Sequence, residues 1–402
     1  NPVGAGDGPA PPMDRSLSPD EAPFRLEVVT DPGAIGDVWR ALEAEAETVP
    51  FETHDWVATW IAAGALGPGV RPLILVGRRG DRLDLVLPLA LDRVGPIRIA
   101  RRLSGSHAGE LRGLVRPGAA PDAASLAAAL RALGRSEGVD AFVFEAVPAG
   151  LAPWLEGVGD ARPSLDDAHA FRLDASFERL LAARNAGHKR KKLKQKEKIL
   201  AAAGDYRVTR AETADEVEAT LAAFFAQKGA ALAARGSDDP FAASGVREAF
   251  RRMAFAALGT DEPLLELTRL EAGGAIRAVI GASIRGGTLH ALFASHAADD
   301  LARASPGETL FFRHIETACG RGLAVYDMGQ GRERYKESWC DETRRLVDVR
   351  LAVTALGRAA VALETAREVV KAAIRRDQRI WPLVRKWRAR LAGRRAGAVE
   401  SD

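Results

Sequence analysis

One supersecondary pattern occurs twice along this chain, and it constrains the fold more than any other feature. The first copy contains a hairpin at 71–91 with a turn around Gly80, and the second contains a hairpin at 264–284 with a turn around Gly273 and Gly274. Glycine suits such turns because it adopts positive φ angles without strain. Helical stretches precede each hairpin, and a helix and a strand follow it, so we expect two consecutive α/β units.

The length of 402 residues also suits two domains better than one core. We predict an α/β (α+β) fold with two tandem domains at 24–165 and 166–355, each with a mixed, mostly antiparallel sheet. The segment 1–23 is rich in glycine and proline and is expected to be a disordered leader. The segment 356–402 is expected to be a basic amphipathic helical tail, since apolar residues recur there at helical spacing.

The composition favours a cytoplasmic protein. The net charge of +3 is too small to indicate nucleic-acid binding by the whole chain. No apolar run approaches the roughly 20 residues that cross a bilayer, and the first residues contain no signal-peptide core. The two cysteines, Cys319 and Cys340, form no CxxC pair and are expected to be reduced thiols, so we predict neither a disulfide framework nor a metal site.

Residues 325–339 form the most specific motif, Val-Tyr-Asp-Met-Gly-Gln-Gly-Arg-Glu-Arg-Tyr-Lys-Glu-Ser-Trp. A short apolar run ends at Asp327, a glycine-rich turn follows, and Tyr335 and Lys336 come next. The segment 303–310 begins a predicted helix directly after another strand-like run. Together, these segments resemble the second half of GNAT acyltransferases of the CelD/BcsL branch, which is related to the FemAB-like tandem-GNAT proteins.

This resemblance extends over residues 24–353 and implies an N-acyltransferase. Such an enzyme transfers the acyl group of acetyl-CoA or another acyl-CoA, without a metal, to an amine of a small molecule or a glycan precursor. The resemblance also implies a role in polysaccharide biosynthesis, such as that of cellulose, or in cell-envelope biosynthesis. The FemAB relationship leaves a second enzyme open, an aminoacyltransferase that uses charged tRNA as its donor.

The resemblance places coenzyme A binding at Arg303, Ser305, Gly307 and Glu308. A helix N-terminus offers unpaired N–H groups and the positive end of the helix dipole, which together bind phosphate. Arg303 and Gly307 match the family's phosphate-binding loop in loose register, whereas Pro306 removes one N–H donor. The alternative is an ordinary Ser-Pro helix start.

Four residues are predicted to act on the reacting groups. Tyr335 is expected to protonate the leaving thiolate or to order the acceptor, and Lys336 to stabilise developing negative charge. Asp327 is expected to orient or deprotonate the acceptor amine. His296, at the end of the candidate pantetheine-binding strand, is a candidate general base. Each residue also has a structural alternative, as a core tyrosine, a solvated lysine, a turn-capping aspartate and a surface histidine.

Two further segments concern substrate binding. The loop 104–110 contains serine, histidine and glutamate, but contiguous residues rarely form a triad, so it is either part of a substrate cleft or a plain connector. The basic run 184–198 contains no aromatic residue, and we do not expect sequence-specific nucleic-acid recognition there. This run is either a solvated helix face or a surface for an anionic substrate, a cofactor phosphate or, under the second hypothesis, tRNA.

The tail combines arginines with Trp381 and Trp387. It either lies on an anionic membrane surface, which would make the protein peripheral to the inner membrane, or docks on the body of the protein. We favour docking for residues 356–374. A non-catalytic component that binds a polysaccharide synthase or the membrane through this tail is therefore a third hypothesis.

Overall fold

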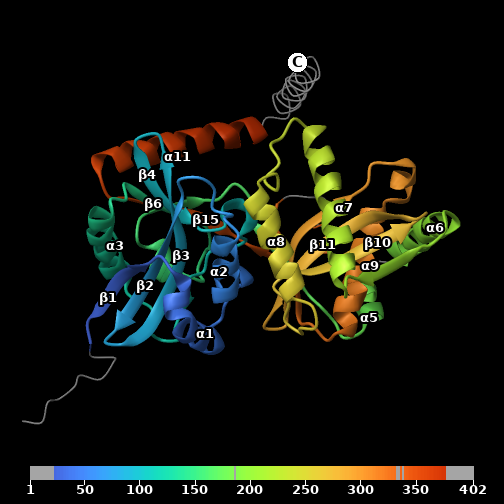
Figure 1. The fold of residues 1–402 in the computed structure, drawn as a ribbon, viewed down its shortest axis with the longest axis horizontal. Helices are drawn as coiled ribbons and strands as arrows, with labels where there is room; N and C mark the ends of the chain where they lie inside the picture. Colours follow the sequence, from blue (N-terminus) through green and yellow to red (C-terminus); the bar gives the residue numbers. More distant parts are fainter. Residues whose placement is uncertain (1–21, 185–186, 332–335, 337–338, 377–402) are drawn as a thin grey trace, which may run out of the picture.

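The computed structural model describes residues 22–184, 187–331, 336 and 339–376. Two sheets stand side by side, with helices on their faces (Figure 1). Within the described residues both sheets are mixed, and two strand pairs are parallel while the rest are antiparallel. The predicted tandem α/β fold is confirmed.

The first sheet follows the order β1-β2-β3-β4-β6-β15-β7, and β5 pairs with β3. Its strands are β1 (Phe24–Val29), β2 (Arg71–Arg79), β3 (Arg82–Val94), β4 (Ile97–Arg102), β5 (Leu114–Val115), β6 (Ala141–Pro148), β7 (Asp160–Pro163) and β15 (Leu346–Ala352). The helices of this half are α1 (Gly36–Glu45), α2 (His54–Ala62), α3 (Ala123–Glu137) and α4 (Pro153–Glu156). Since side chains alternate along a strand, Leu73 and Leu75 pack with α3 and α4, whereas Ile74 packs with α1 and α2.

The second sheet follows the order β14-β8-β13-β12-β11-β10-β9. Its strands are β8 (Ala168–Arg172), β9 (Arg207–Arg210), β10 (Glu266–Ala272), β11 (Ala275–Arg285), β12 (Thr288–His296), β13 (Val325–Gln330) and β14 (Glu342–Arg344). The helices of this half are α5 (Phe177–Ala183), α6 (Gly187–Ala202), α7 (Ala214–Ala233), α8 (Ser244–Ala256) and α9 (Pro306–Gly320). Apolar residues of α7 and α8 pack toward the first half, while those of α5, α6 and α9 pack on the opposite face.

The two halves share one hydrophobic core. Trp56 and Trp60 of α2 contact Phe250 of α8, with ring centroids 6.4 and 5.7 Å apart. Val76 of β2 and Phe293 of β12 belong to the same buried cluster. Burial of one large apolar side chain contributes about 1.5–3 kcal/mol. Packing, rather than a linker, therefore fixes how the halves sit relative to one another.

The chain returns to the first half after completing the second sheet. β15 lies between β6 and β7, so the predicted domain 166–355 contributes one strand to the first sheet. The next element, α11 (Ala355–Arg376), packs across β4, β6 and β15 (Figure 1). The first part of the predicted tail is thus docked on the body of the protein. No helix in the described part of the chain is long and apolar enough to cross a membrane.

Polar contacts and one close backbone approach hold α11 on the sheet. Glu364 and Glu368 pair with Arg101 of β4 and Arg350 of β15, respectively. Gly357 lies so close to β6 that an added Cβ atom would stand 1.8 Å from the carbonyl oxygen of Asp140. The leader before residue 22 and the tail beyond residue 376 lie outside the described residues.

Candidate active site

β12 and β13 are neighbours only at their starts, as far as the structure describes the chain. They pair in parallel over residues 288–290 and 325–327, and β12 then continues to His296 along β11. The register between β12 and β11 shifts once, which leaves Leu292 without a partner, as in a β-bulge. Beyond residue 290, β12 therefore has an edge that β13 does not cover, here called the open edge.

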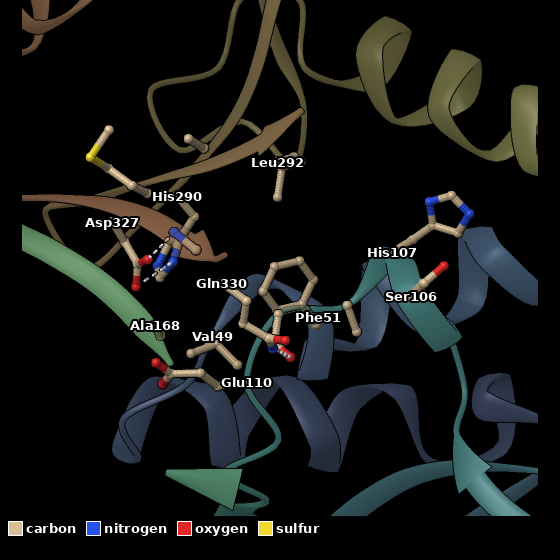
Figure 2. A pocket seen from close by; sticks show the side chains of 15 residues that line it. Val49, Phe51, Ser106, His107, Glu110, Ala168, His290, Leu292, Asp327 and Gln330 are labelled. Atoms are coloured by element: carbon tan, nitrogen blue, oxygen red, sulfur yellow. Dashed lines mark hydrogen bonds and ion pairs between the residues drawn. The ribbon is translucent and has the colours of Figure 1, made fainter. Parts of the chain in front are cut away.

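A cavity of about 190 Å³, the interdomain cavity, lies beside the first part of the open edge (Figure 2). The first half lines it with Val49, Phe51 and residues 106–110, and the second half lines it with Ala168, residues 290–292 and residues 327–330. Gln330 Nε2 of β13 donates a hydrogen bond to the Gly109 carbonyl at 3.1 Å, which joins the halves at this cavity.

Ion pairs run along one wall of the interdomain cavity. Arg344 of β14 pairs with Asp327 and donates from Nε to Glu110 of the first half at 2.6 Å. Glu110 also accepts from Arg112 at 2.9 Å. The side chains of Glu110 and Asp327 are only 5% and 10% exposed. Buried carboxylates require such partners, because an unpaired buried charge costs several kcal/mol.

His290 of β12 lies beside these ion pairs. Its Nδ1 atom is 3.8 Å from Oδ2 of Asp327 (Figure 2). Burial lowers the pKa of His290 to about 4; Arg112 and Arg344 also lower it, while Asp327 opposes the shift. The imidazole is therefore neutral at pH 7, and it can accept a hydrogen bond from a bound amine.

A larger groove of about 950 Å³ continues from the interdomain cavity to the surface. The two spaces share Val49, His290 and Asp327. Charged side chains of both signs line the groove, including those of Glu43 and Arg285. A polar ligand can therefore reach Asp327 from outside. The described residues contain no group of three or more His, Cys, Asp or Glu side chains that could hold a metal ion.

A second cavity of about 510 Å³, the helix-side cavity, lies beside the last part of the open edge. It is lined by Lys189, Lys192, Val279, Ile280, Ala294, Ser295, His296, Gly307, Glu308, Phe311, Phe312 and Trp339. Lys189 Nζ lies 4.8 Å from the ring centroid of Trp339. Burial is the main cause that lowers the pKa of this lysine, and the positive charge of Arg184 lowers it further. The cavity thus joins an apolar wall to two lysines and the start of α9.

The start of α9 is only partly as predicted. Ser305 adopts a left-handed conformation, with φ of 47°, and Pro306 is the first helical residue. Gly307 and Glu308 line the helix-side cavity, whereas Arg303 is exposed and neither it nor Ser305 lines the cavity. Glu308 also forms an ion pair with Lys196 at 2.5 Å. Two of the four predicted coenzyme A residues are therefore brought to one cavity.

The four predicted catalytic residues lie in different places. Asp327 lines the interdomain cavity, while His296 lines the helix-side cavity. Lys336 is buried, and its Nζ donates to the Gln330 carbonyl at 2.6 Å, so it holds the end of β13. Tyr335 lies outside the described residues.

The loop 104–110 lines the interdomain cavity without forming a triad. His107 Nε2 lies 3.1 Å from the Pro240 carbonyl oxygen, its ring packs on Phe241, and burial lowers its pKa. Ser104 Oγ accepts a hydrogen bond from Trp56 at 2.8 Å. Glu110 is the residue of this loop that reaches the ion pairs.

Two residues of the site, His290 and Arg344, were not predicted. His290 is paired in register with Asp327 across β12 and β13, and the only available signal was that both lie on strand-like stretches. Arg344 ends a strand of three residues, which is too short to produce a recognisable alternation.

Most of the second half matches a known family. Residues 187–337 match the family described as an acetyltransferase (GNAT) domain. No curated protein gave a significant sequence match. A conserved protein of unknown function from Bacteroides thetaiotaomicron VPI-5482 has a similar structure, with 12% identity and a TM-score of 0.53 over 82% of this chain and 100% of that chain.

Two further solved structures share the fold. The C-terminal domain of a putative lysylphosphatidylglycerol synthetase from Agrobacterium fabrum has 12% identity and a TM-score of 0.51 over 84% of this chain and 97% of that chain. FemX has 12% identity and a TM-score of 0.52 over 81% of this chain and 96% of that chain. At such identities the likeness establishes the fold alone. The predicted GNAT acyltransferase is confirmed at the level of the domain, and the CelD/BcsL branch stays a prediction.

Proposed function

We propose that this GNAT acyltransferase moves an acyl group from an acyl-CoA in the helix-side cavity to an amine in the interdomain cavity. One observation carries the proposal: residues 290–292 of β12 line one cavity and residues 294–296 line the other. A donor that lies along the open edge reaches both cavities. Coenzyme A is the favoured donor because GNAT domains usually use acyl-CoA.

The helix-side cavity offers a separate region for each part of coenzyme A. Amides of the pantetheine arm can add to the open edge as a further strand would. Phe311 and Phe312 of α9 offer an apolar wall to the rest of the arm. The N-terminus of α9 at Gly307 and the ammonium groups of Lys189 and Lys192 suit the phosphates.

Acyl transfer requires the acceptor amine to lose a proton and the thiolate to leave. The amine nitrogen attacks the thioester carbonyl, a C–N bond forms, and the C–S bond breaks. We assign Asp327 to hold the amine and receive its proton, and His290 to accept a hydrogen bond from the amine, because both side chains line the interdomain cavity and the imidazole is neutral. Tyr335 stays the predicted donor of a proton to the thiolate.

The acceptor is proposed to be a polar amine, either a small molecule or a glycan precursor. The 950 Å³ groove that leads from the interdomain cavity to the surface supports this class of acceptor, since Arg112 and Arg285 line it together with Glu43 and Glu262. Charges of both signs match an acceptor that combines amine with hydroxyl or acidic groups. A role in polysaccharide or envelope biosynthesis rests on the CelD/BcsL resemblance.

A charged tRNA is the second candidate donor, because one observation favours it. Lys191, Lys192, Lys194 and Lys198 of α6 are all exposed, so this helix offers positive charge beyond the cavity itself. A polyanion that follows such a helix binds with a steep dependence on salt, whereas a single coenzyme A depends on salt less.

Calorimetric titration with acetyl-CoA tests the donor site. Lys192→Glu should weaken binding about tenfold, or ~1.4 kcal/mol, because this lysine lines the helix-side cavity. Lys198→Glu is the matched control, since it makes the same charge change on an exposed residue of α6 that lines no described cavity. If folded wild-type protein binds aminoacyl-tRNA but not acetyl-CoA, charged tRNA becomes the favoured donor in place of acyl-CoA.

A further inference from the structure

Leucines and valines of α11 are exposed rather than packed on the sheet. Leu356, Leu363, Val369 and Val370 are 41%, 51%, 59% and 57% exposed, respectively. The side of the helix that faces the sheet instead carries Gly357 and Ala360 with the paired glutamates described above. The sequence of this helix is therefore not explained by its packing on the sheet.

The exposed apolar residues form one continuous stripe. At 3.6 residues per turn, Leu356, Leu363 and Val370 align along the helix, and exposed alanines at 359 and 366 lie between them. By the same spacing, the exposed residues Arg358 and Arg367 lie at the two borders of this stripe. We call it the outer stripe. An apolar stripe bordered by arginines is typical of helices that lie in the plane of a membrane surface.

We propose that the outer stripe of α11 binds the surface of an anionic lipid bilayer. In this arrangement the leucines and valines enter the acyl region, while Arg358 and Arg367 meet lipid phosphates. Charge supports this partner, because the sequence from 379 to 395 adds six arginines and one lysine without an acid. Basic residues near such a surface are attracted to its negative charge.

Charge also argues against a second copy of the chain on the same stripe. Two such stripes in contact would bring the arginines at their borders close to like charges. The lipid proposal does not depend on the proposed function, because α11 lines neither the interdomain nor the helix-side cavity.

Vesicle flotation of the full chain tests the proposal. Wild-type protein should float with vesicles of phosphatidylcholine and phosphatidylglycerol but not with phosphatidylcholine alone. The double variant Leu363→Glu with Val370→Glu should weaken the binding at least about tenfold. Val94→Glu is the control for an added surface glutamate, because Val94 is 50% exposed on the hairpin of β3 and β4. This variant should bind as wild type does.

Three outcomes would overturn the inference. Wild-type protein that fails to float with anionic vesicles excludes the lipid partner. Equal binding by the double variant assigns any membrane contact to the basic segment after α11. Wild-type protein that is dimeric by light scattering, with a monomeric double variant and no vesicle binding, assigns the outer stripe to a second copy. Circular dichroism should show that every variant is folded, since all three substituted residues are exposed.

Discussion

Replacing Arg344 with methionine should destabilise the protein through the carboxylates that this arginine joins. Arg344 is 14% exposed and pairs with Glu110 of the first half and Asp327 of the second. Methionine fills a similar volume but leaves both carboxylates without their shared cation. Removal of one partner from a fully buried ion pair costs about 3–5 kcal/mol.

The expected loss lies at the lower end of that range, because each carboxylate keeps another partner. Glu110 still accepts from Arg112 at 2.9 Å, and Asp327 still accepts from the Gly329 N–H at 2.7 Å. We therefore expect Arg344→Met to lower the free energy of unfolding by about 3 kcal/mol.

Urea unfolding followed by circular dichroism measures this loss. Arg162→Met is the control, because Arg162 pairs with Asp160 on the surface, where both side chains are about half exposed (49% and 48%) and such pairs contribute about 0–1 kcal/mol. A double-mutant cycle of Arg344→Met with Asp327→Asn should give a coupling energy of about 2 kcal/mol. Additivity within about 0.5 kcal/mol would refute the reasoning.

Burial is the main cause that raises the pKa of Glu52 from 4.5 to about 7, so the folded state binds a proton in that range that the unfolded state does not. The contribution of Glu52 to stability should therefore be fully present below pH 4.5 and decrease by about 3 kcal/mol as pH rises through about 7. Glu52→Gln should remove this part of the slope of urea midpoints against pH, and an unchanged slope would assign it to another group. Gly357→Ala should lower the thermal unfolding temperature by the equivalent of about 1–3 kcal/mol, because its Cβ would stand 1.8 Å from the Asp140 carbonyl oxygen. A rise in the unfolding temperature would mean that the higher helix propensity of alanine, about 1 kcal/mol, outweighs the clash with the Asp140 carbonyl oxygen. His290→Asn should lower kcat of acyl transfer about 10²-fold while leaving the Kd for acetyl-CoA unchanged, and a loss confined to Kd would contradict its place on the acceptor side.

The hairpins and the tandem arrangement were predictable because their signals are local. The strands of β2 with β3 and of β10 with β11 are adjacent in sequence, and a glycine turn connects each pair. α8 was missed, although Val246, Phe250 and Met253 recur at helical spacing. Its buried face is completed by α2 of the other half, so the sequence around it does not reveal what it packs against.

The site was predictable only where a motif marks it. The motifs point to Asp327, in the apolar run that begins β13, and to the helix start at Gly307, and both residues line cavities. Arg344 and His290 gain their roles from strand pairing: β14 lies on one side of β8 and β13 on the other, and β12 meets β13 in register. Which strands become neighbours depends on residues that are far apart in the sequence, so it cannot be predicted from any short segment.

The position of β15 has a consequence for how the chain is synthesised. β7 is hydrogen-bonded into the first sheet through β15 alone within the described residues, yet its residues leave the ribosome long before 346–352 do. During translation, β6 therefore presents an unpaired edge until the second half is almost complete, and such edges recruit strands from other chains. A gene fragment that stops before residue 346 should accordingly give an aggregating product rather than an independent first half.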